Sequence, residues 1–187
     1  MARRTDKRER LVAAAKTLIH QQGFNHTTLA DIAEQAGVPL GNVYYYFRTK
    51  EDLAAAVIDE RADEFRRLFD AWDREHSDPR ARLLAYIDLV GRIRQTLATA
   101  GCPVGGLCEE LDRLQSALSG KANEILKLHL EWATEQFRQL GKGEQSADLA
   151  LHFVSGVQGM SLLAHAFGDP GIVDREVRSL QGWLQAV

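Results

Sequence analysis

The chain is poor in the residues that mark several classes of protein. Its 187 residues include two cysteines, Cys102 and Cys108, and only 7% of them are aromatic. Two cysteines are too few for a disulfide scaffold, and a hydrophobic content of 45% is too high for a disordered chain. No run approaches the ~18 apolar residues of a membrane span, and no apolar signal core stands at the N-terminus. These absences predict a cytoplasmic protein that buries a core of its own.

Positive charge is concentrated in the first part of the chain. The formal net charge of -3 argues weakly against nucleic-acid binding. Residues 1–50, however, hold eight Lys and Arg against four Asp and Glu, whereas the remainder holds 15 against 22. The first part is therefore +4 and the rest −7. Such asymmetry predicts a basic surface for a polyanion, and the alternative is an ordinary solvated surface.

Helical periodicity covers nearly the whole chain. No β-alternating run and no Asn-Gly hairpin signal is present, and glycine and proline stops divide the apolar pattern. The sequence predicts an all-α fold of about nine helices. Their expected ranges are 5–22, 28–36, 39–46, 49–75, 79–97, 104–117, 121–140, 145–167 and 170–186.

Residues 28–47 have the layout of a helix-turn-helix motif. Thr28 followed by Asp31 predicts a capping box at the first helix. Gly37 supplies the left-handed conformation that a tight turn needs, and Pro39 suits the first turn of the second helix. In such motifs the second helix enters the DNA major groove. Helix–glycine–helix alone is a weak signal, because any helical hairpin shows it.

The contents of the second helix strengthen the interpretation. Val43 and Phe47 lie four residues apart and share one face, which suits the core. Another face is left with Leu40, Gly41, Asn42, Tyr44 and Tyr45. Tyrosine hydroxyls reach phosphates, and asparagine pairs bidentately with adenine.

The stretch 28–53 resembles the signature of the TetR family of transcriptional regulators. Its most specific part is VYYYF at 43–47 followed by KEDL at 50–53. The resemblance implies a three-helix DNA-binding domain over 1–48 and a helical ligand-binding and dimerisation domain over 49–187. It also implies a ligand-responsive regulator that acts as a repressor, although no residue decides between repression and activation.

The resemblance assigns DNA-contacting roles in the first domain. The residues concerned are Thr27, Thr28, Leu40, Gly41, Asn42, Tyr44, Tyr45, Tyr46 and Lys50. The two threonines would meet phosphates through a hydroxyl or helix N-terminal N–H groups, and Tyr45, Tyr46 and Lys50 would also meet the DNA backbone. The groove-facing residues that would meet base edges are Leu40, Gly41, Asn42 and Tyr44. The basic arm of Arg3, Arg4, Lys7, Arg8 and Arg10 would add phosphate or minor-groove contacts, or else is a frayed terminus.

The second domain would bind a small-molecule effector. Candidate lining residues are Tyr86, Cys102, Leu107, His129, Trp132, Phe153, Val157 and His165. Ordinary core packing is the alternative for each. Cys102 lies near the start of a predicted helix, where a thiol pKa falls. It also resembles the cysteine of family members that sense electrophiles or oxidants, so thiol sensing is a second hypothesis beside that of a buried small hydrophobe.

A two-fold DNA operator, palindromic in sequence, requires a homodimer. We expect its interface in 145–167 and 170–186. Ser155 and Gly159 there permit close helix approach, beside Gly156. The apolar stripe of Val173, Val177, Leu180, Trp183 and Leu184 would meet the partner or else close the monomer's own core.

The sequence motifs give no support for catalysis or for cofactor binding. His129, His152 and His165 form no i,i+4 pair, so no metal site is expected. Nucleophile-elbow, dinucleotide and phosphate-loop motifs are absent. We therefore expect neither an enzyme nor a cofactor. A helical interaction module without DNA binding remains a remote alternative.

Overall fold

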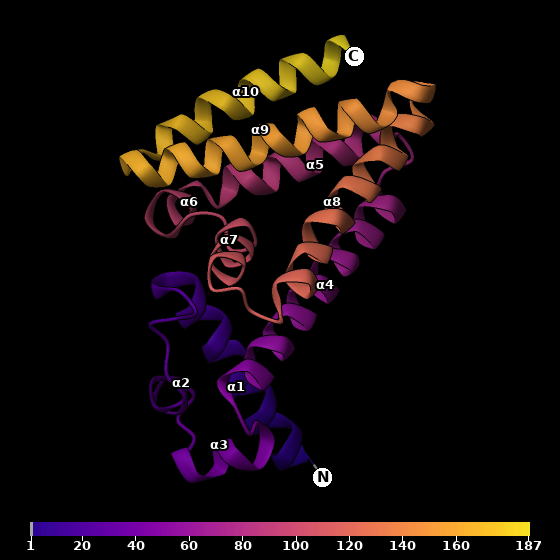
Figure 1. Cartoon of the computed structure of the whole chain (residues 1–187). Helices are drawn as coiled ribbons and strands as arrows, with labels where there is room; N and C mark the ends of the chain where they lie inside the picture. Colours follow the sequence, from indigo (N-terminus) through magenta and orange to yellow (C-terminus); the bar gives the residue numbers. More distant parts are fainter. Residues whose placement is uncertain (1) are drawn as a thin grey trace. The chain divides into compact units, whose positions relative to one another are not determined.

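The protein is an all-α chain in the computed structural model, which describes residues 2–187, with the backbone alone for residues 2–5. Over this part of the chain there are ten α-helices, one short 3₁₀ helix and no strand, which confirms the predicted fold class (Figure 1). The α-helices are α1 (Ala2–Gln22), α2 (Leu29–Ala36), α3 (Leu40–Tyr46), α4 (Lys50–Glu75), α5 (Pro79–Arg92), α6 (Arg94–Ala100), α7 (Gly105–Arg113), α8 (Ser119–Gln139), α9 (Ser146–Phe167) and α10 (Pro170–Ala186). The 3₁₀ helix spans Gly143–Gln145.

One predicted helix is in fact two. The range 79–97 is divided into α5 and α6 because the backbone of Ile93 has a ψ of 14°, far from the roughly −42° of an α-helix. Leu97 nevertheless lies buried on α6. The apolar spacing thus continues across the break, and periodicity alone does not reveal it.

Two compact units make up the chain. Unit 1 comprises residues up to 64 together with 106–125, and unit 2 comprises 65–105 together with 126–187. Helices α4 and α8 each run from one unit into the other. The expected division between 48 and 49 is a division of function, and it stays a prediction. The compact units place α7 with the N-terminal helices.

Unit 1 is built around the predicted motif. Thr28 caps α2 in a full capping box with Asp31, and Gly37 ends α2 in the left-handed conformation at φ 60°. Val43 and Phe47 are buried, as their spacing predicts. Tight capping at both ends explains why an eight-residue helix holds its shape before α3.

Unit 2 has an aromatic core. Helices α9 and α10 run side by side and α5 adjoins α10 (Figure 1). Phe69 stacks on Trp132 with ring centroids 4.5 Å apart, and Tyr86 meets Phe153 edge-on. Burial of such rings dominates core energetics, since each removes roughly 150–250 Å² from water. Among the described residues, no helix is long and apolar enough to cross a membrane.

Candidate DNA interface and ligand cavity

Helix α3 presents large side chains to solvent. Leu40, Tyr44 and Tyr45 are 41%, 55% and 64% exposed. Tyr46 is half-buried and its ring meets Tyr45 edge-on at 5.0 Å. Large exposed apolar clusters usually mark interaction sites in soluble proteins. Helix α3 therefore has the surface of a helix that binds another molecule. The base and phosphate contacts expected of residues 40–46 stay predictions.

The two motif threonines differ in their surroundings. Thr28 is exposed, and its Oγ1 accepts a hydrogen bond from the Asp31 N–H at 3.1 Å, which leaves the hydroxyl hydrogen free to donate to a phosphate. Thr27 is wholly buried, and its hydroxyl donates to the Gly23 carbonyl at 2.7 Å. The Thr27 hydroxyl is therefore already bonded inside unit 1, and the phosphate contact expected of Thr27 stays a prediction.

Part of the basic arm serves the fold. Helix α1 begins at Ala2, so the arm continues the helix, while the side chains of Arg3 and Arg4 lie outside the described residues. The Arg10 guanidinium donates to the carbonyls of Ala36 and Gly37, at the turn between α2 and α3. Arg10 thus supplies donors to the carbonyl end of α2, which the helix itself leaves unbonded.

Two charged side chains hold the loop between α1 and α2. The Glu110 carboxylate on α7 accepts the N–H groups of Phe24 and Asn25 at 2.7 and 2.8 Å. The Lys50 ammonium donates to the carbonyls of the same two residues at 2.9 and 3.2 Å and lies 4.3 Å from the centre of the Phe24 ring. Lys50 therefore binds this loop through two of its ammonium hydrogens. The expected contact with a phosphate stays a prediction for the third.

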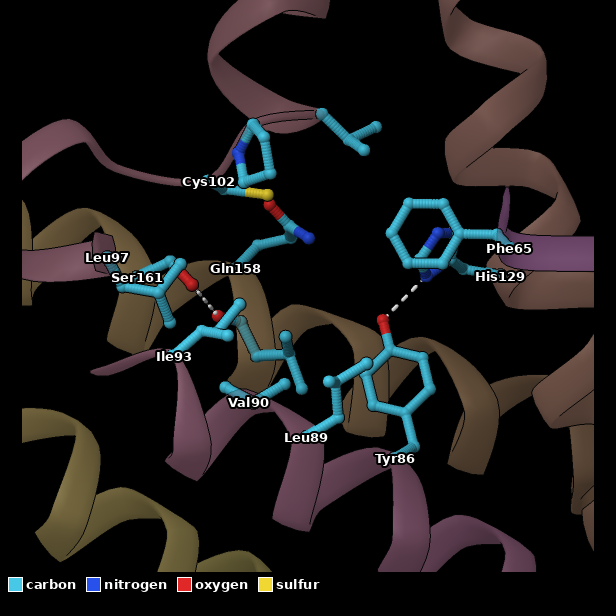
Figure 2. Close-up of a pocket in the computed structure, with 13 residues that line it drawn as sticks. Phe65, Tyr86, Leu89, Val90, Ile93, Leu97, Cys102, His129, Gln158 and Ser161 are labelled. Carbon is cyan, nitrogen blue, oxygen red and sulfur yellow. Dashed lines mark hydrogen bonds between the residues drawn. The ribbon is translucent and has the colours of Figure 1, made fainter. Parts of the chain in front are cut away.

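Unit 2 contains an apolar cavity of about 490 Å³ that includes space open to solvent (Figure 2). Its lining comes from the unit 2 part of α4, from α5 and α6, from the segment before α7, and from α8 and α9. The lining residues are Phe65, Tyr86, Leu89, Val90, Ile93, Leu97, Cys102, Pro103, Val104, His129, Val157, Gln158 and Ser161. None of them carries a formal charge at neutral pH.

Four of the eight predicted ligand residues line this cavity, namely Tyr86, Cys102, His129 and Val157. The other four do not. Leu107 is buried in unit 1, Trp132 and Phe153 pack inside the aromatic core, and His165 is exposed. An apolar helical position suits a core as well as a cavity, so residue type does not separate the two cases.

Some of the cavity residues that were not predicted could have been found from the pattern of the sequence. Ile93 and Leu97 follow Tyr86 at helical spacing, so they extend the face on which Tyr86 lies. Gln158 is a polar residue within an otherwise apolar stretch of α9, next to Val157. Phe65 had no such signal, because its entry into the cavity depends on the packing of α4 in unit 2.

A buried polar pair forms one part of the lining. The Tyr86 hydroxyl lies 2.6 Å from His129 Nδ1 (Figure 2). His129 is 3% exposed, and its Nε2 is buried without a hydrogen-bond partner among the described residues. Burial lowers the pKa of His129 to about 4, because a charged imidazolium loses its hydration there. Burial likewise raises the pKa of Tyr86 well above its usual value.

Cys102 lies at another part of the cavity. Its Sγ accepts the Gly105 N–H at 3.3 Å, and Figure 2 shows it beside Gln158. The Ser161 hydroxyl nearby donates to the Val157 carbonyl at 2.7 Å, which uses its hydrogen. Cys108 is buried in unit 1. The thiol that meets the cavity is therefore that of Cys102.

Helix α9 keeps an apolar face in solvent. Leu151, Leu162, Leu163 and Phe167 are 55%, 64%, 48% and 73% exposed. Gly159 has open space around the position of a side chain. Gly156, in contrast, lies against Leu180 of α10 within the same unit.

The α10 stripe closes the core of its own unit. Val173, Leu180 and Leu184 are buried there, and Val177 and Trp183 pack against them. The stripe thus packs in the core of its own unit, as one of the two alternatives predicts, and a role for its partly buried members in a dimer stays a prediction. The expected dimer interface in residues 145–167 and 170–186 stays a prediction.

Comparison with known proteins identifies relatives along most of the chain. The family model for bacterial regulatory proteins of the tetR family matches residues 11–57. The HTH-type transcriptional regulator LmrA of Bacillus subtilis is 31% identical over 165 residues, which cover 85% of this chain and 86% of LmrA.

Solved structures share the fold along nearly the whole chain. A TetR transcriptional regulator from Legionella pneumophila superposes with a TM-score of 0.84 at 24% identity, over 93% of this chain and 95% of that one. The reduced form of E. coli NemR superposes with a TM-score of 0.79 at 20% identity, over 94% and 96% of the two chains.

Proposed function

Because the chain belongs to the TetR family of bacterial regulatory proteins and is a DNA-binding transcriptional regulator, we propose that it is a repressor whose operator complex is released by a small molecule bound in the unit 2 cavity. Its relatives are named as transcriptional regulators, and the chain is not an enzyme. The observation that carries the proposal is the pairing of an exposed α3 in unit 1 with an apolar cavity in unit 2.

Operator binding rests on the geometry of the motif. The left-handed turn at Gly37 sets α3 after a capped α2, and Tyr44 and Tyr45 stand exposed on α3. A helix of this kind reads base edges in the major groove while hydroxyl and N–H groups meet phosphates. Asn42 and Tyr44 would supply the direct readout.

A homodimer would bring two motifs to a palindromic operator. The exposed leucines of α9 and Phe167 offer the apolar surface, and the open space at Gly159 permits a close approach of a second helix. Apolar cores with small residues at the crossing are typical of helical interfaces. We propose that α9 of each protomer lies at the centre of this interface and that α10 contributes its exposed side.

Two chain segments would couple the cavity to the DNA-binding helices. Phe65 lines the cavity on α4, the helix that begins at Lys50. Val104 lines it directly before α7, the helix that carries Glu110. Lys50 and Glu110 both bond the loop ahead of α2. A ligand that favours one position of these segments changes DNA affinity, and DNA changes ligand affinity by the same factor.

Footprinting on the DNA upstream of the protein's own gene and of its neighbours tests the proposal. We expect a protected two-fold site whose occupancy falls steeply with salt, with a log–log slope of about −0.9 per phosphate neutralised. The Asn42→Ala variant should lose preference for that site and keep the salt slope. Absence of DNA binding at low salt would contradict the proposal.

Thiol sensing is a second candidate function, favoured by one observation. The Cys102 Sγ lines the cavity and accepts a hydrogen bond from the Gly105 N–H, so the thiol is placed where a bound molecule would meet it. An α,β-unsaturated carbonyl compound would be attacked at its β-carbon. The new S–C bond forms as the C=C π electrons shift to the enolate, and the enolate then takes up the proton lost by the thiol.

Alkylation with N-ethylmaleimide separates the two functions. If Cys102 is the sensor, the reagent should abolish operator binding by the wild type and by Cys108→Ser, while Cys102→Ser keeps its DNA affinity. Equal loss in Cys102→Ser, which keeps the thiol of Cys108, would exclude Cys102 as the sensor.

A further inference from the structure

We propose that the effector is a neutral, mainly apolar molecule whose one hydrogen-bond acceptor, a carbonyl oxygen or its equivalent, takes the Nε2–H of His129. The inference rests on the proposed function and deepens it, because it names the chemistry that the cavity selects. It is argued from one buried pair, Tyr86 with His129, and from the composition of the remaining lining.

The pair determines which imidazole nitrogen carries the proton. A phenol hydroxyl has a single hydrogen, and the partner of the buried Tyr86 hydroxyl is His129 Nδ1, at 2.6 Å. If the hydroxyl donates, Nδ1 is the acceptor and the neutral ring holds its hydrogen on Nε2. The reverse arrangement would leave the phenol hydrogen without an acceptor in an apolar site, which costs free energy. Tyr86 therefore holds His129 as the Nε2–H tautomer.

This tautomer leaves a donor without a partner. Nε2 is buried and makes no hydrogen bond to any residue that the structure describes, although buried polar groups are nearly always bonded. His129 lies in the lining of the cavity, with the Phe65 ring 4.2 Å away between centroids (Figure 2). A ligand oxygen that accepts the Nε2–H would satisfy this donor, and Phe65 would pack on the apolar part of the ligand.

The other lining residues exclude a charged ligand. They comprise leucine, valine, isoleucine, proline and phenylalanine side chains, with Cys102, Gln158 and Ser161 as the further polar groups. The Ser161 hydrogen is already donated to Val157, and His129 is neutral at physiological pH. No Lys, Arg, Asp or Glu lines the cavity, so an ionic ligand would lose its hydration without gaining a counter-charge.

Three naphthalenes that differ only in the substituent at position 2 test the ligand class. We would measure binding of 2-acetylnaphthalene, 2-ethylnaphthalene and 2-naphthoate to the full-length protein by calorimetry. We expect the ketone to bind about tenfold more tightly than the ethyl compound, as one satisfied hydrogen bond predicts, and the carboxylate to bind most weakly. Equal affinities of the ketone and the ethyl compound, preference for naphthoate, or no binding of any probe would overturn the inference.

Substitutions in the cavity test whether His129 is the group that donates a hydrogen bond to the ligand carbonyl. In the double variant His129→Leu/Tyr86→Phe the ketone should lose its tenfold advantage, whereas Gln158→Leu, at another part of the lining, should keep it. Loss of the advantage in Gln158→Leu with retention in the double variant would assign the carbonyl to Gln158 and overturn the proposal. DNA binding of each variant, measured in parallel, keeps a failure of the ligand class distinct from a failure of the regulator function.

A measurement on the wild type does not depend on whether the variants fold. Long-range ¹H–¹⁵N NMR of the histidine rings reports the tautomer directly. We expect His129 to carry its hydrogen on Nε2 at neutral pH and the Nε2–H resonance to shift when 2-acetylnaphthalene is added but not with 2-ethylnaphthalene. A hydrogen on Nδ1 would contradict the inference.

Discussion

Gly41 occupies a position in α3 where a larger side chain would fit. None of the described residues has an atom within 4 Å of the place that its Cβ would take. The Gly41→Ala variant should therefore gain about 0.5–1 kcal/mol of stability, because glycine is a poor helix former. If α3 docks in the groove, the same methyl group should weaken operator binding roughly tenfold, equivalent to ~1.4 kcal/mol. Thermal unfolding and titration with operator DNA measure the two effects.

Gly37 is the matched control, because its conformation forbids the same change. Its φ is 60°, and an added Cβ would lie 2.8 Å from Arg10 Nη2. Gly37→Ala should therefore destabilise the protein by ~1–2 kcal/mol, the cost of the left-handed conformation. Unchanged operator affinity in Gly41→Ala would show that residue 41 does not approach DNA closely.

Individual residues differ in how far their surroundings can be predicted. The spacing of Val43 and Phe47 predicts their burial, and both are buried. The hydroxyl of Thr27 follows no such rule. Its hydrogen bond to Gly23 depends on how the loop after α1 folds back, and that path is set by contacts from residues distant in the sequence.

Helix α7 contributes a carboxylate that holds the loop ahead of the DNA-binding motif. Glu110 accepts two backbone N–H groups, one with each oxygen. In Glu110→Gln one of these acceptors becomes an NH₂ group that faces an N–H donor. We expect a loss of ~1–3 kcal/mol in unfolding free energy, because a partly buried hydrogen bond to a charged acceptor is lost, together with weaker operator binding, because Thr28 follows this loop.

The neighbouring residue supplies the control. Glu109 is exposed and pairs with Arg113 one turn away on α7. Glu109→Gln should change stability by less than ~0.5 kcal/mol, because exposed helical ion pairs contribute little. Denaturant unfolding of both variants compares them. Equal effects of the two substitutions would mean that the contact of Glu110 with the loop contributes nothing specific.

Helix positions follow largely from the sequence, whereas the cavity does not. Capping residues such as Thr28 and stops such as Gly37 and Gly168 act within one turn of the chain, so local reasoning finds them. The cavity is assembled from five helices and one connecting segment of unit 2. Which apolar residues face it depends on packing among those elements, as Phe65 and Trp132 show.

A dimer through α9 predicts the effect of a charge on its exposed face. Leu162 is 64% exposed on α9. Leu162→Glu should leave the protomer folded, because the residue is outside the core. It should convert the dimer to a monomer and reduce operator affinity, since buried unpaired charges are costly. Light scattering coupled to gel filtration measures the mass of each species.

Leu114 provides a comparison away from that face. It follows α7, is 46% exposed and lies in unit 1. Leu114→Glu should retain the mass of the wild-type protein and its operator affinity. A wild-type protein that is monomeric, or a Leu162→Glu variant that stays dimeric, would remove α9 from the interface.

The neutral His129 makes the stability of the whole protein depend on pH. Its pKa is about 4 when folded and 6.5 in its ordinary state. Between these values the unfolded chain binds a proton that the folded protein does not, so stability falls as pH decreases from 6.5 to 4. The loss is about 3 kcal/mol, from ~1.4 kcal/mol per pKa unit. Urea unfolding should show a smaller loss in His129→Leu/Tyr86→Phe, and an equal loss would refute the assignment.

Local chemistry in the chain was enough to predict the all-α class and the helix-turn-helix, because caps, turns and apolar spacing act over a few residues. The TetR family entered through the resemblance of residues 28–53 to its signature. Long-range packing decided the rest. It buried the α10 stripe in its own unit, bound Lys50 to the α1–α2 loop and left His129 Nε2 without a partner in an apolar cavity. Such outcomes depend on which elements meet, and apolar periodicity carries no information about that choice.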